Sequence, residues 1–252
     1  MEGIAERVTA VQQRIEFAAA CVGRNPAAIT LVAVTKTWPP ETVLAAYAAG
    51  LRHFGENRAE ELAAKRPFLE THLGMDKAKS ITWHLIGTLQ SRKTALAAAH
   101  ADVFHALDRL KIAHRLARDL ADNGGTPGQP FTLPVFLEVN VSGEASKSGF
   151  NCTRWEEDAA QTAVLRTAVA EIITLPGLAF AGLMTMAPWD APPDEIRAVF
   201  RRTRQLAARL QTDLALPTPL SLSMGMTDDF EIAIEEGATH VRVGRAIFGE
   251  RP

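Results

Sequence analysis

Residues 31–36 read Leu-Val-Ala-Val-Thr-Lys, an apolar and partly β-branched run that ends in a lysine just before Thr37-Trp38-Pro39-Pro40. Such a run predicts a buried strand with an amine at its carboxyl end. Burial lowers the pKa of a lysine and so favours the neutral amine, a nucleophile that forms Schiff bases. Lys36 is therefore either a Schiff-base residue or a solvated lysine where the strand emerges, and this stretch alone leaves both interpretations open.

Strands and helices alternate along the rest of the chain. We expect strands at residues 31–36, 52–54, 82–86, 103–107, 133–139, 178–183, 220–223 and 240–243. Helices are expected near residues 4–18, 40–47, 60–69, 90–99, 110–121, 154–173, 194–214 and 228–236. The glycine-rich stretch 123–130 leads into a strand and lacks the Gly-Lys-Ser/Thr ending of a phosphate loop, so we interpret it as a connector.

This alternation predicts a closed barrel. Alternating strands and helices imply parallel pairing, and eight units in 252 residues favour a (β/α)8 TIM barrel over an open doubly wound sheet. The open sheet would also be expected to carry Gly-x-Gly-x-x-Gly after a strand, and the sequence has none. We therefore predict a single α/β domain over residues 1–252, with an extra helix before the first strand.

Composition narrows the function classes. The net charge is -2 and no basic stripe is interleaved with aromatic residues, which argues against a nucleic-acid partner. Cys21 and Cys152 lie far apart and form no Cys-x-x-Cys, and no His-x-x-x-His pair stands on a helix beside a carboxylate, so we expect neither a disulfide nor a metal site. Charged residues near the N-terminus are unlike a signal peptide, and no run of about 18 apolar residues occurs. We expect a soluble, cytoplasmic protein with no membrane partner.

Small and polar residues follow the predicted strands, where (β/α)8 barrels carry their working residues. They are Lys36, the turn 55–57, Gly87, Gln90, Asn140, Ser142, residues 184–186, residues 223–226, Gly244 and Arg245. Loops after the seventh and eighth strands of such barrels commonly bind phosphate through backbone N–H groups, and Ser223, Gly225, Gly244 and Arg245 could supply such donors. A Schiff-base lysine facing a phosphate site is typical of a pyridoxal phosphate (PLP) site.

Four carboxylates near these loops need an interpretation. Asp228 and Asp229 would repel phosphate if they faced it, and we interpret both as capping residues of the following helix. Glu138, with Glu144, flanks the end of the fifth strand and is as readily a surface feature as a carboxylate pair.

Several motifs occur together and in order along the chain. They are Ala33-Val34-Thr35-Lys36-Thr37, Phe54-Gly55-Glu56-Asn57, Trp83-His84-Leu85-Ile86-Gly87, Leu89-Gln90-Ser91, Ser146-Lys147-Ser148-Gly149, Gly182-Leu183-Met184-Thr185-Met186, Leu222-Ser223-Met224-Gly225-Met226 and Gly244-Arg245-Ala246-Ile247-Phe248-Gly249. From about residue 30 to the end, the chain closely resembles the pyridoxal phosphate homeostasis protein family. The resemblance implies an alanine-racemase-like barrel that holds PLP as an internal aldimine on Lys36.

The resemblance also implies roles for further residues. Asn57 would lie beside the cofactor, Arg242 would face the pyridine nitrogen, and the phosphate would be held by Ser223, Gly244 and Arg245. With Lys36, Met224 and Gly225, these residues form the expected cofactor-binding set. Trp38 and Arg92 stand where many relatives are expected to carry a lysine and an asparagine, which puts contacts at the rim of the site in doubt.

Three functions remain open at this point. The family is thought to buffer and deliver PLP without a reaction of its own, and this is the function we expect, with PLP-dependent apo-enzymes as transient partners and a monomeric state. The alternative is an amino-acid racemase, but its second base is a tyrosine, and the only tyrosine here, Tyr47, lies inside a predicted helix. A Schiff-base aldolase would need a proton shuttle that the sequence does not identify. Lys147 is either a secondary acceptor amine or a surface lysine on a loop.

Overall fold

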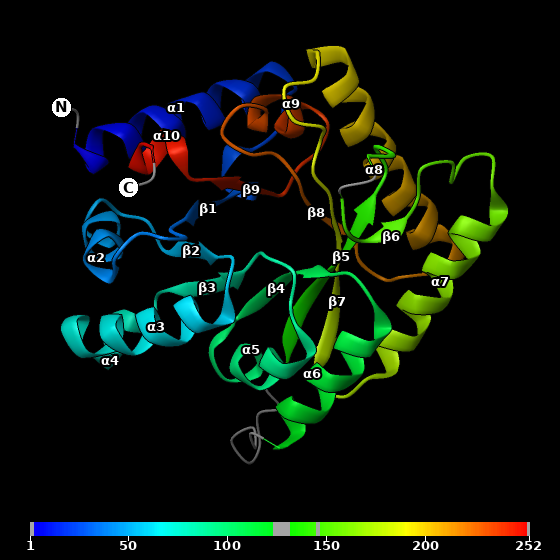
Figure 1. The fold of residues 1–252 in the computed structure, drawn as a ribbon. Helices are drawn as coiled ribbons and strands as arrows, with labels where there is room; N and C mark the ends of the chain where they lie inside the picture. Colours follow the sequence, from blue (N-terminus) through cyan, green and yellow to red (C-terminus); the bar gives the residue numbers. More distant parts are fainter. Residues whose placement is uncertain (1–2, 123–131, 145–146, 251–252) are drawn as a thin grey trace.

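Parallel strands surround a central axis in this computed structural model, which describes residues 3–122, 132–144 and 147–250 (Figure 1). The strands of the barrel are β1 (Thr30–Val34), β2 (His53–Glu56), β3 (Thr82–Leu85), β4 (Val103–Leu107), β5 (Leu133–Asn140), β7 (Leu178–Met184), β8 (Ser221–Ser223) and β9 (His240–Val243). Their spatial order is β4-β3-β2-β1-β9-β8-β7-β5, and pairing of β4 with β5 closes the ring. The prediction of a closed (β/α)8 barrel is confirmed.

Helices cover the outside of the strands (Figure 1). They are α1 (Ile4–Cys21), α2 (Pro40–Ala48), α3 (Ala59–Leu73), α4 (Met75–Ala78), α5 (Thr94–His100), α6 (Leu110–Asp122), α7 (Ala159–Thr174), α8 (Pro193–Asp213), α9 (Phe230–Glu235) and α10 (Arg245–Phe248), with short 3-10 turns at Pro26–Ala28 and Ser91–Lys93. Within the described residues, none of the helices has the length and apolar character needed to cross a membrane.

The extra N-terminal helix α1 follows from its apolar spacing. Val8, Val11, Ile15 and Ala18 recur every three to four residues and are buried against the barrel. The C-terminal segment is held beside it, because Arg24 donates to the carbonyl oxygens of residues 234 and 238 at 2.6 and 2.7 Å. The helix therefore covers the side of the barrel where the first and last strands pair.

Several predicted boundaries were wrong. Strand β2 continues through Glu56, where we expected a turn at residues 55–57. Helix α7 begins at residue 159 and not near 154, because Asp158 caps it by accepting a hydrogen bond from the N–H of Ala160 at 3.0 Å. The short helices α4 and α10 and the two-residue strand β6 (Phe150–Asn151) were missed. The expected connector 123–130 lies outside the described residues.

Close backbone contact between β7 and β8 requires glycine at position 182. This residue has φ = 153°, and a Cβ atom there would lie 1.9 Å from the carbonyl oxygen of Ser221. A larger residue would push the two strands apart.

Candidate functional site

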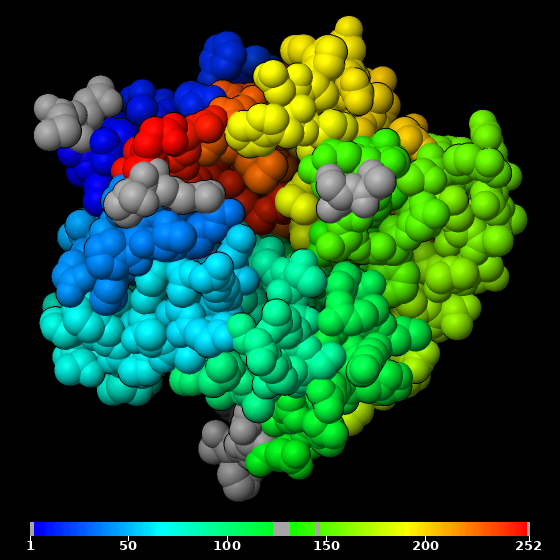
Figure 2. Space-filling view, viewed as in Figure 1, coloured from blue at the N-terminus to red at the C-terminus, as the bar shows by residue number. Residues whose placement is uncertain are grey.

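A cavity of about 600 Å³ opens at the carboxyl ends of the strands. It is lined by Val34, Lys36, Trp38, Asn57, Ile86, Gly87, Thr88, Ala106, Glu138, Met184, Met186, Trp189, Met226, Thr227, Asp228, Arg242, Gly244, Arg245, Gly249 and Glu250. The space-filling view shows the hollow near the centre of this face, below the orange segment and above the cyan and teal segments (Figure 2). Five residues of the expected cofactor-binding set therefore border one cavity: Lys36, Asn57, Arg242, Gly244 and Arg245.

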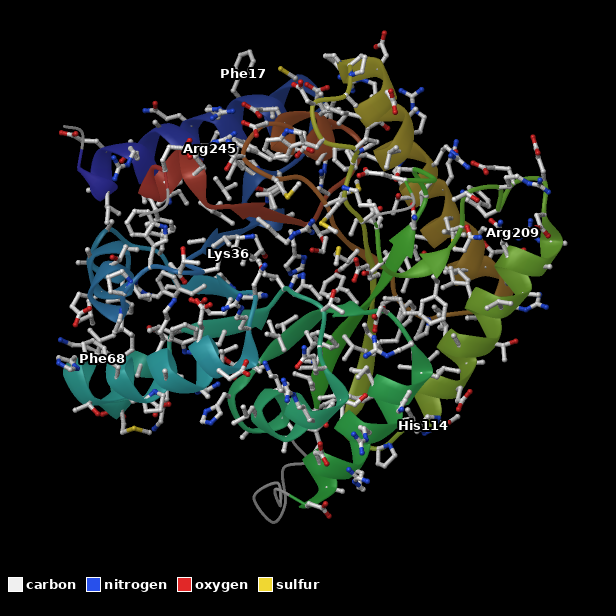
Figure 3. All side chains as sticks on the ribbon, viewed as in Figure 1. Phe17, Lys36, Phe68, His114, Arg209 and Arg245 are labelled. Atoms are coloured by element: carbon white, nitrogen blue, oxygen red, sulfur yellow. The ribbon has the colours of Figure 1, made fainter. Side chains whose placement is uncertain are left out.

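Lys36 follows β1 and lies toward the centre of the ring (Figure 3). Strand β1 ends at Val34, two residues earlier than expected, and the Lys36 side chain is half-buried at the cavity wall. The next residue, Thr37, has φ = 69°, a strained value for a β-branched residue. Its N–H donates to Glu61 at 2.8 Å, which helps to hold this conformation. The chain on the far side of Lys36 is thus fixed by a residue from α3.

The chain before Lys36 is fixed by a buried ion pair that sequence analysis missed. Lys65 donates to Glu56 Oε1 at 2.7 Å and to the carbonyl oxygen of Thr35 at 2.8 Å. The Thr35 hydroxyl donates to the same Glu56 oxygen at 2.6 Å. Burial raises the pKa of Glu56 to about 7, although the ammonium of Lys65 and the Thr35 hydroxyl both lower it. Lys65 stands four residues after Glu61 on α3. This spacing was the only signal in the sequence that Lys65 takes part in an ion pair.

Arg242 reaches the cavity from inside the barrel. Successive side chains of a strand point to opposite faces, so Arg242 and its neighbouring valines in β9 point in opposite directions, and all three are buried. Arg242 donates to the carbonyl oxygen of Thr185 at 3.0 Å and to Ser223 Oγ at 2.6 Å. Burial lowers the pKa of Arg242 to about 10, and the carboxylates of Asp229 and Glu138 act in the other direction. The guanidinium therefore stays charged at neutral pH.

Glu138 lies in the same cavity and is not a surface residue. It is only 3% exposed, and its Oε2 has no hydrogen-bond partner within the described ranges. Burial raises the pKa of Glu138, and nearby Asp108 adds to this effect, whereas Arg242 and Lys147 lower it. The sequence left this placement open: Glu138 is one carboxylate near the end of the apolar run of β5, and it was interpreted as either a surface feature or part of a carboxylate pair.

Asn57 and Gly87 form a close backbone contact at the cavity wall. A Cβ atom on Gly87 would lie 2.3 Å from the carbonyl oxygen of Asn57. Gly87 follows β3 and Asn57 follows β2, and these strands are paired in register. Only a residue without a side chain lets the two loops approach this closely.

Three residues of the expected set do not border the cavity with their side chains. Ser223 is fully buried, and its hydroxyl contacts His105 and Arg242. Met224 is also fully buried, and its N–H donates to the carbonyl oxygen of His240. Gly225 has φ = 95°, and a Cβ atom there would lie 2.6 Å from that of Ala233 on α9. The structure thus places these three residues in the packing beneath the loop after β8.

Arg245 and Asp228 form an ion pair at the edge of the cavity. Asp228 was expected to cap the following helix, and this interpretation was wrong for its side chain. Asp229 does occupy the N-cap position of α9, but its carboxylate accepts from the N–H of Met226, upstream of the helix. The Arg245 guanidinium lies 5.9 Å from the centre of the exposed Trp189 ring. Arg245 opens α10 directly after Gly244 (Figure 3).

Other residues singled out by sequence take different places. Trp38 lines the cavity and packs against Phe248, whereas Arg92 is exposed and bonds to Gln90. Tyr47 lies on α2, half-buried against the core, and its hydroxyl is 3.4 Å from Ser80 Oγ. Lys147 donates to the carbonyl oxygen of Ala187 at 2.9 Å and is mostly buried, so it is not a surface lysine.

Comparison with known proteins agrees with this geometry. Residues 7–252 match the family model described as alanine racemase, N-terminal domain, and the barrel with a lysine just after its first strand defines a protein of that class. The chain is 43% identical over 251 residues to a protein of Pseudomonas aeruginosa named pyridoxal phosphate homeostasis protein, covering 100% of this chain and 97% of that one. An Escherichia coli K12 protein with the same name is 42% identical over 255 residues, covering 100% and 98%.

A solved structure is similar over the same length. PipY of Synechococcus elongatus, whose structure was determined with PLP bound, is 34% identical, with a TM-score of 0.78 and coverage of 98% of this chain and 100% of that chain. The chain described here belongs to the pyridoxal phosphate homeostasis protein family.

Proposed function

We propose that this protein binds PLP through a Schiff base on Lys36 and acts in intracellular PLP homeostasis by buffering and delivering the cofactor, without a catalytic reaction of its own. The observation that supports this most strongly is the single cavity that brings Lys36, Arg242 and Arg245 together. The full-length similarity to proteins named for PLP homeostasis supports the same function.

The residues present suit PLP. The cavity offers one amine and two guanidinium groups to a ligand that carries an aldehyde and a phosphate. The unpartnered oxygen of Glu138 leaves room for one more polar contact. When bound, PLP supplies an aldehyde that condenses with amines and a ring that accepts electrons. Lys36 would hold the aldehyde end, Asn57 would lie beside the ring, and Gly244 and Arg245 would bind the phosphate.

Ser223, Met224 and Gly225 remain in the proposed binding set through the loop that they begin. Their buried positions fix the start of residues 226–228, which border the cavity. Because the N–H of Met224 already donates to His240, we expect these three residues to act by shaping the loop more than by direct contact.

Arg242 is the residue that we expect to prevent the bound cofactor from catalysing a reaction. A guanidinium donates hydrogen bonds and accepts none, so a pyridine nitrogen facing Arg242 would stay unprotonated. An unprotonated ring is a weak electron sink, which disfavours carbanion chemistry. The charge of Arg242 therefore favours holding the cofactor over using it.

The racemase alternative requires a second acid–base group opposite Lys36. Tyr47 is the only tyrosine of the chain, and it lies on α2 beside Ser80, outside the cavity lining. Without that group a racemase would lose roughly 10²–10⁴-fold in rate. We propose further that residues 1–252 form one PLP-binding domain, that the protein is a cytoplasmic monomer, and that PLP-dependent apo-enzymes are transient recipients.

An absorption spectrum of the purified protein tests the binding proposal. We expect a visible band that borohydride abolishes, with the reduced cofactor attached to the Lys36 peptide. Lys36→Ala should lose the band, whereas Lys147→Ala, which removes a second amine, should keep it. Retention of the band in Lys36→Ala with the adduct on another lysine would refute the assignment. Robust racemisation of alanine that depends on Lys36 would favour the alternative function.

A further inference from the structure

A continuous chain of polar side chains crosses the barrel interior and ends at Arg242. The Nδ1 of His53 lies 3.0 Å from Nε2 of His84, and Nδ1 of His84 lies 2.8 Å from Nε2 of His105. The Nδ1 of His105 lies 2.7 Å from Ser223 Oγ, which accepts from Arg242 at 2.6 Å. The members come from β2, β3, β4, β8 and β9. The chain thus connects one wall of the barrel to the guanidinium on the other.

The guanidinium fixes the direction of every bond in this chain. Arg242 can only donate, so Ser223 Oγ is an acceptor there. Ser223 is fully buried, and His105 Nδ1 is the acceptor that its hydroxyl reaches within the part of the chain that the structure describes. Ser223 therefore donates to His105. A neutral His105 then carries its proton on Nε2 and donates to His84, which by the same reasoning donates from Nε2 to His53.

The direction holds only if the imidazoles are uncharged. A protonated His105 would donate from both nitrogens and would place a second cation near Arg242. Burial lowers the pKa of His84 and of His105 well below the usual range, and the neighbouring imidazoles lower both further. His240, whose ring packs edge-on against His105, is also neutral, because burial lowers its pKa to about 4.

A neutral chain suits a guanidinium that must keep its charge. Two acidic side chains, Asp229 and Glu138, attract Arg242 electrostatically. Without a competing bond the guanidinium would be free to turn toward either carboxylate. Ser223 and the carbonyl oxygen of Thr185 together occupy two of its five N–H groups without neutralising it. The remaining N–H groups are the ones available at the cavity wall.

We propose that Ser223, His105 and His84 are positioning residues for Arg242, acting as one directional hydrogen-bond chain in which each histidine is the Nε2–H tautomer. The chain orients the guanidinium toward the ligand in the cavity. This inference rests on the proposed function only in taking that ligand to be PLP. It assigns the Ser223 hydroxyl to the barrel interior and not to the phosphate.

The first test needs no cofactor. In cofactor-free protein labelled with ¹⁵N-histidine, we expect the ring nitrogens of His84 and His105 to show the Nε2–H tautomer at neutral pH. Assignment of either ring as the Nδ1–H tautomer or as imidazolium would overturn the proposal. This result is independent of whether PLP binds.

A matched pair of variants then tests the effect on Arg242. His105→Asn keeps an acceptor oxygen near the place of Nδ1, whereas His105→Leu removes it. We expect the leucine variant to speed solvent exchange of the Arg242 guanidinium protons, to weaken PLP binding about tenfold or more, and to change the pH dependence of the visible band. The asparagine variant should stay close to the unmodified protein. Equal behaviour of the two variants would overturn the proposal.

Two further variants keep the test decisive. His240→Leu removes a buried imidazole that lies beside the hydrogen-bond chain but is not part of it. Solvent exchange of the Arg242 guanidinium protons should then be unchanged. Should His105→Leu fail to fold, Ser223→Ala breaks the same link with a smaller change in volume, and it must speed Arg242 exchange. If the unmodified protein does not bind PLP, the proposed function fails, while Arg242 exchange still decides the positioning role.

Discussion

Lys65 and Glu56 form a buried ion pair, 2.7 Å between Nζ and Oε1, that holds the backbone on which Lys36 stands. Their side chains are 6% and 0% exposed. The pair does not touch the cavity lining, yet it binds both the hydroxyl and the carbonyl oxygen of Thr35. Because Thr35 directly precedes Lys36, loss of the pair would loosen the backbone that carries Lys36, the residue that we propose to bind PLP. The ion pair therefore links the stability of the barrel to the geometry of the site.

Glu56→Gln should change how stability depends on pH. Burial raises the pKa of Glu56 from 4.5 to about 7, so the folded protein binds a proton that the unfolded chain releases between these values. The contribution of Glu56 is therefore fully present below about pH 4.5 and is lost as pH rises through 7, an effect on the order of 3 kcal/mol. Denaturant unfolding at several pH values should show that the free energy of unfolding falls less with rising pH in the variant than in the unmodified protein. Equal slopes in the variant, in the unmodified protein and in the exposed control Glu16→Gln would contradict this expectation.

Arg242→Met should destabilise the protein, and more at high pH than at low pH. The change removes a buried cation that bonds to Ser223 and Thr185 and stabilises the charged forms of Asp229 and Glu138. Leaving buried charges without their partner typically costs about 3–5 kcal/mol. Burial already raises the pKa of both carboxyl groups, and the substitution raises it further, so protonation at low pH recovers part of the loss. A destabilisation that is equal at pH 5 and pH 8 would show that these carboxylates do not depend on Arg242.

Most of the fold could be predicted from the sequence, because its strands alternate with helices and its apolar residues recur at regular spacing. The amine of Lys36 was found for a similar reason, since it follows directly after an apolar run, whereas Arg242 of β9 was named through the resemblance to the family. These signals are local, so they can be recognised in the sequence without knowledge of tertiary contacts.

The rest of the site depends on contacts between distant segments. Glu56 was read as a turn residue, because its partner Lys65 stands on the next helix and only packing brings them together. Asp228 was read as a cap, because its partner Arg245 arrives from the following strand–helix unit. Glu138 was left open between a surface feature and a carboxylate pair, because only the closed barrel brings it to the cavity beside Arg242. Pairings across the barrel are set by register and curvature, which one sequence does not display.

Gly87→Ala should disturb PLP binding through the backbone alone. The added methyl group would lie 2.3 Å from the carbonyl oxygen of Asn57, so the peptide of Asn57 must move. Overpacking of this kind typically costs about 1–3 kcal/mol. We expect both a lower free energy of unfolding and weaker PLP binding in a spectroscopic titration. Gly3→Ala, where nothing lies within 4 Å of the new atom, is the matched control. Unchanged PLP affinity in Gly87→Ala would show that the Asn57 backbone is not part of the binding geometry.

Substitutions of Lys147 should distinguish an acceptor amine from a residue that anchors a loop at the cavity. Its Nζ donates to the carbonyl oxygen of Ala187, just before Trp189, which lines the cavity. Lys147→Met removes this bond and should lower the free energy of unfolding by about 1 kcal/mol. It should also change the rate at which PLP passes to an apo-enzyme. Lys147→Arg can still donate to Ala187 but has no amine that forms a Schiff base. We expect the arginine variant to restore both properties, because the bond to Ala187 anchors the loop that carries Trp189. If the rate of PLP transfer to an apo-enzyme were changed as much in the arginine variant as in the methionine variant, Lys147 would be identified as an acceptor amine instead.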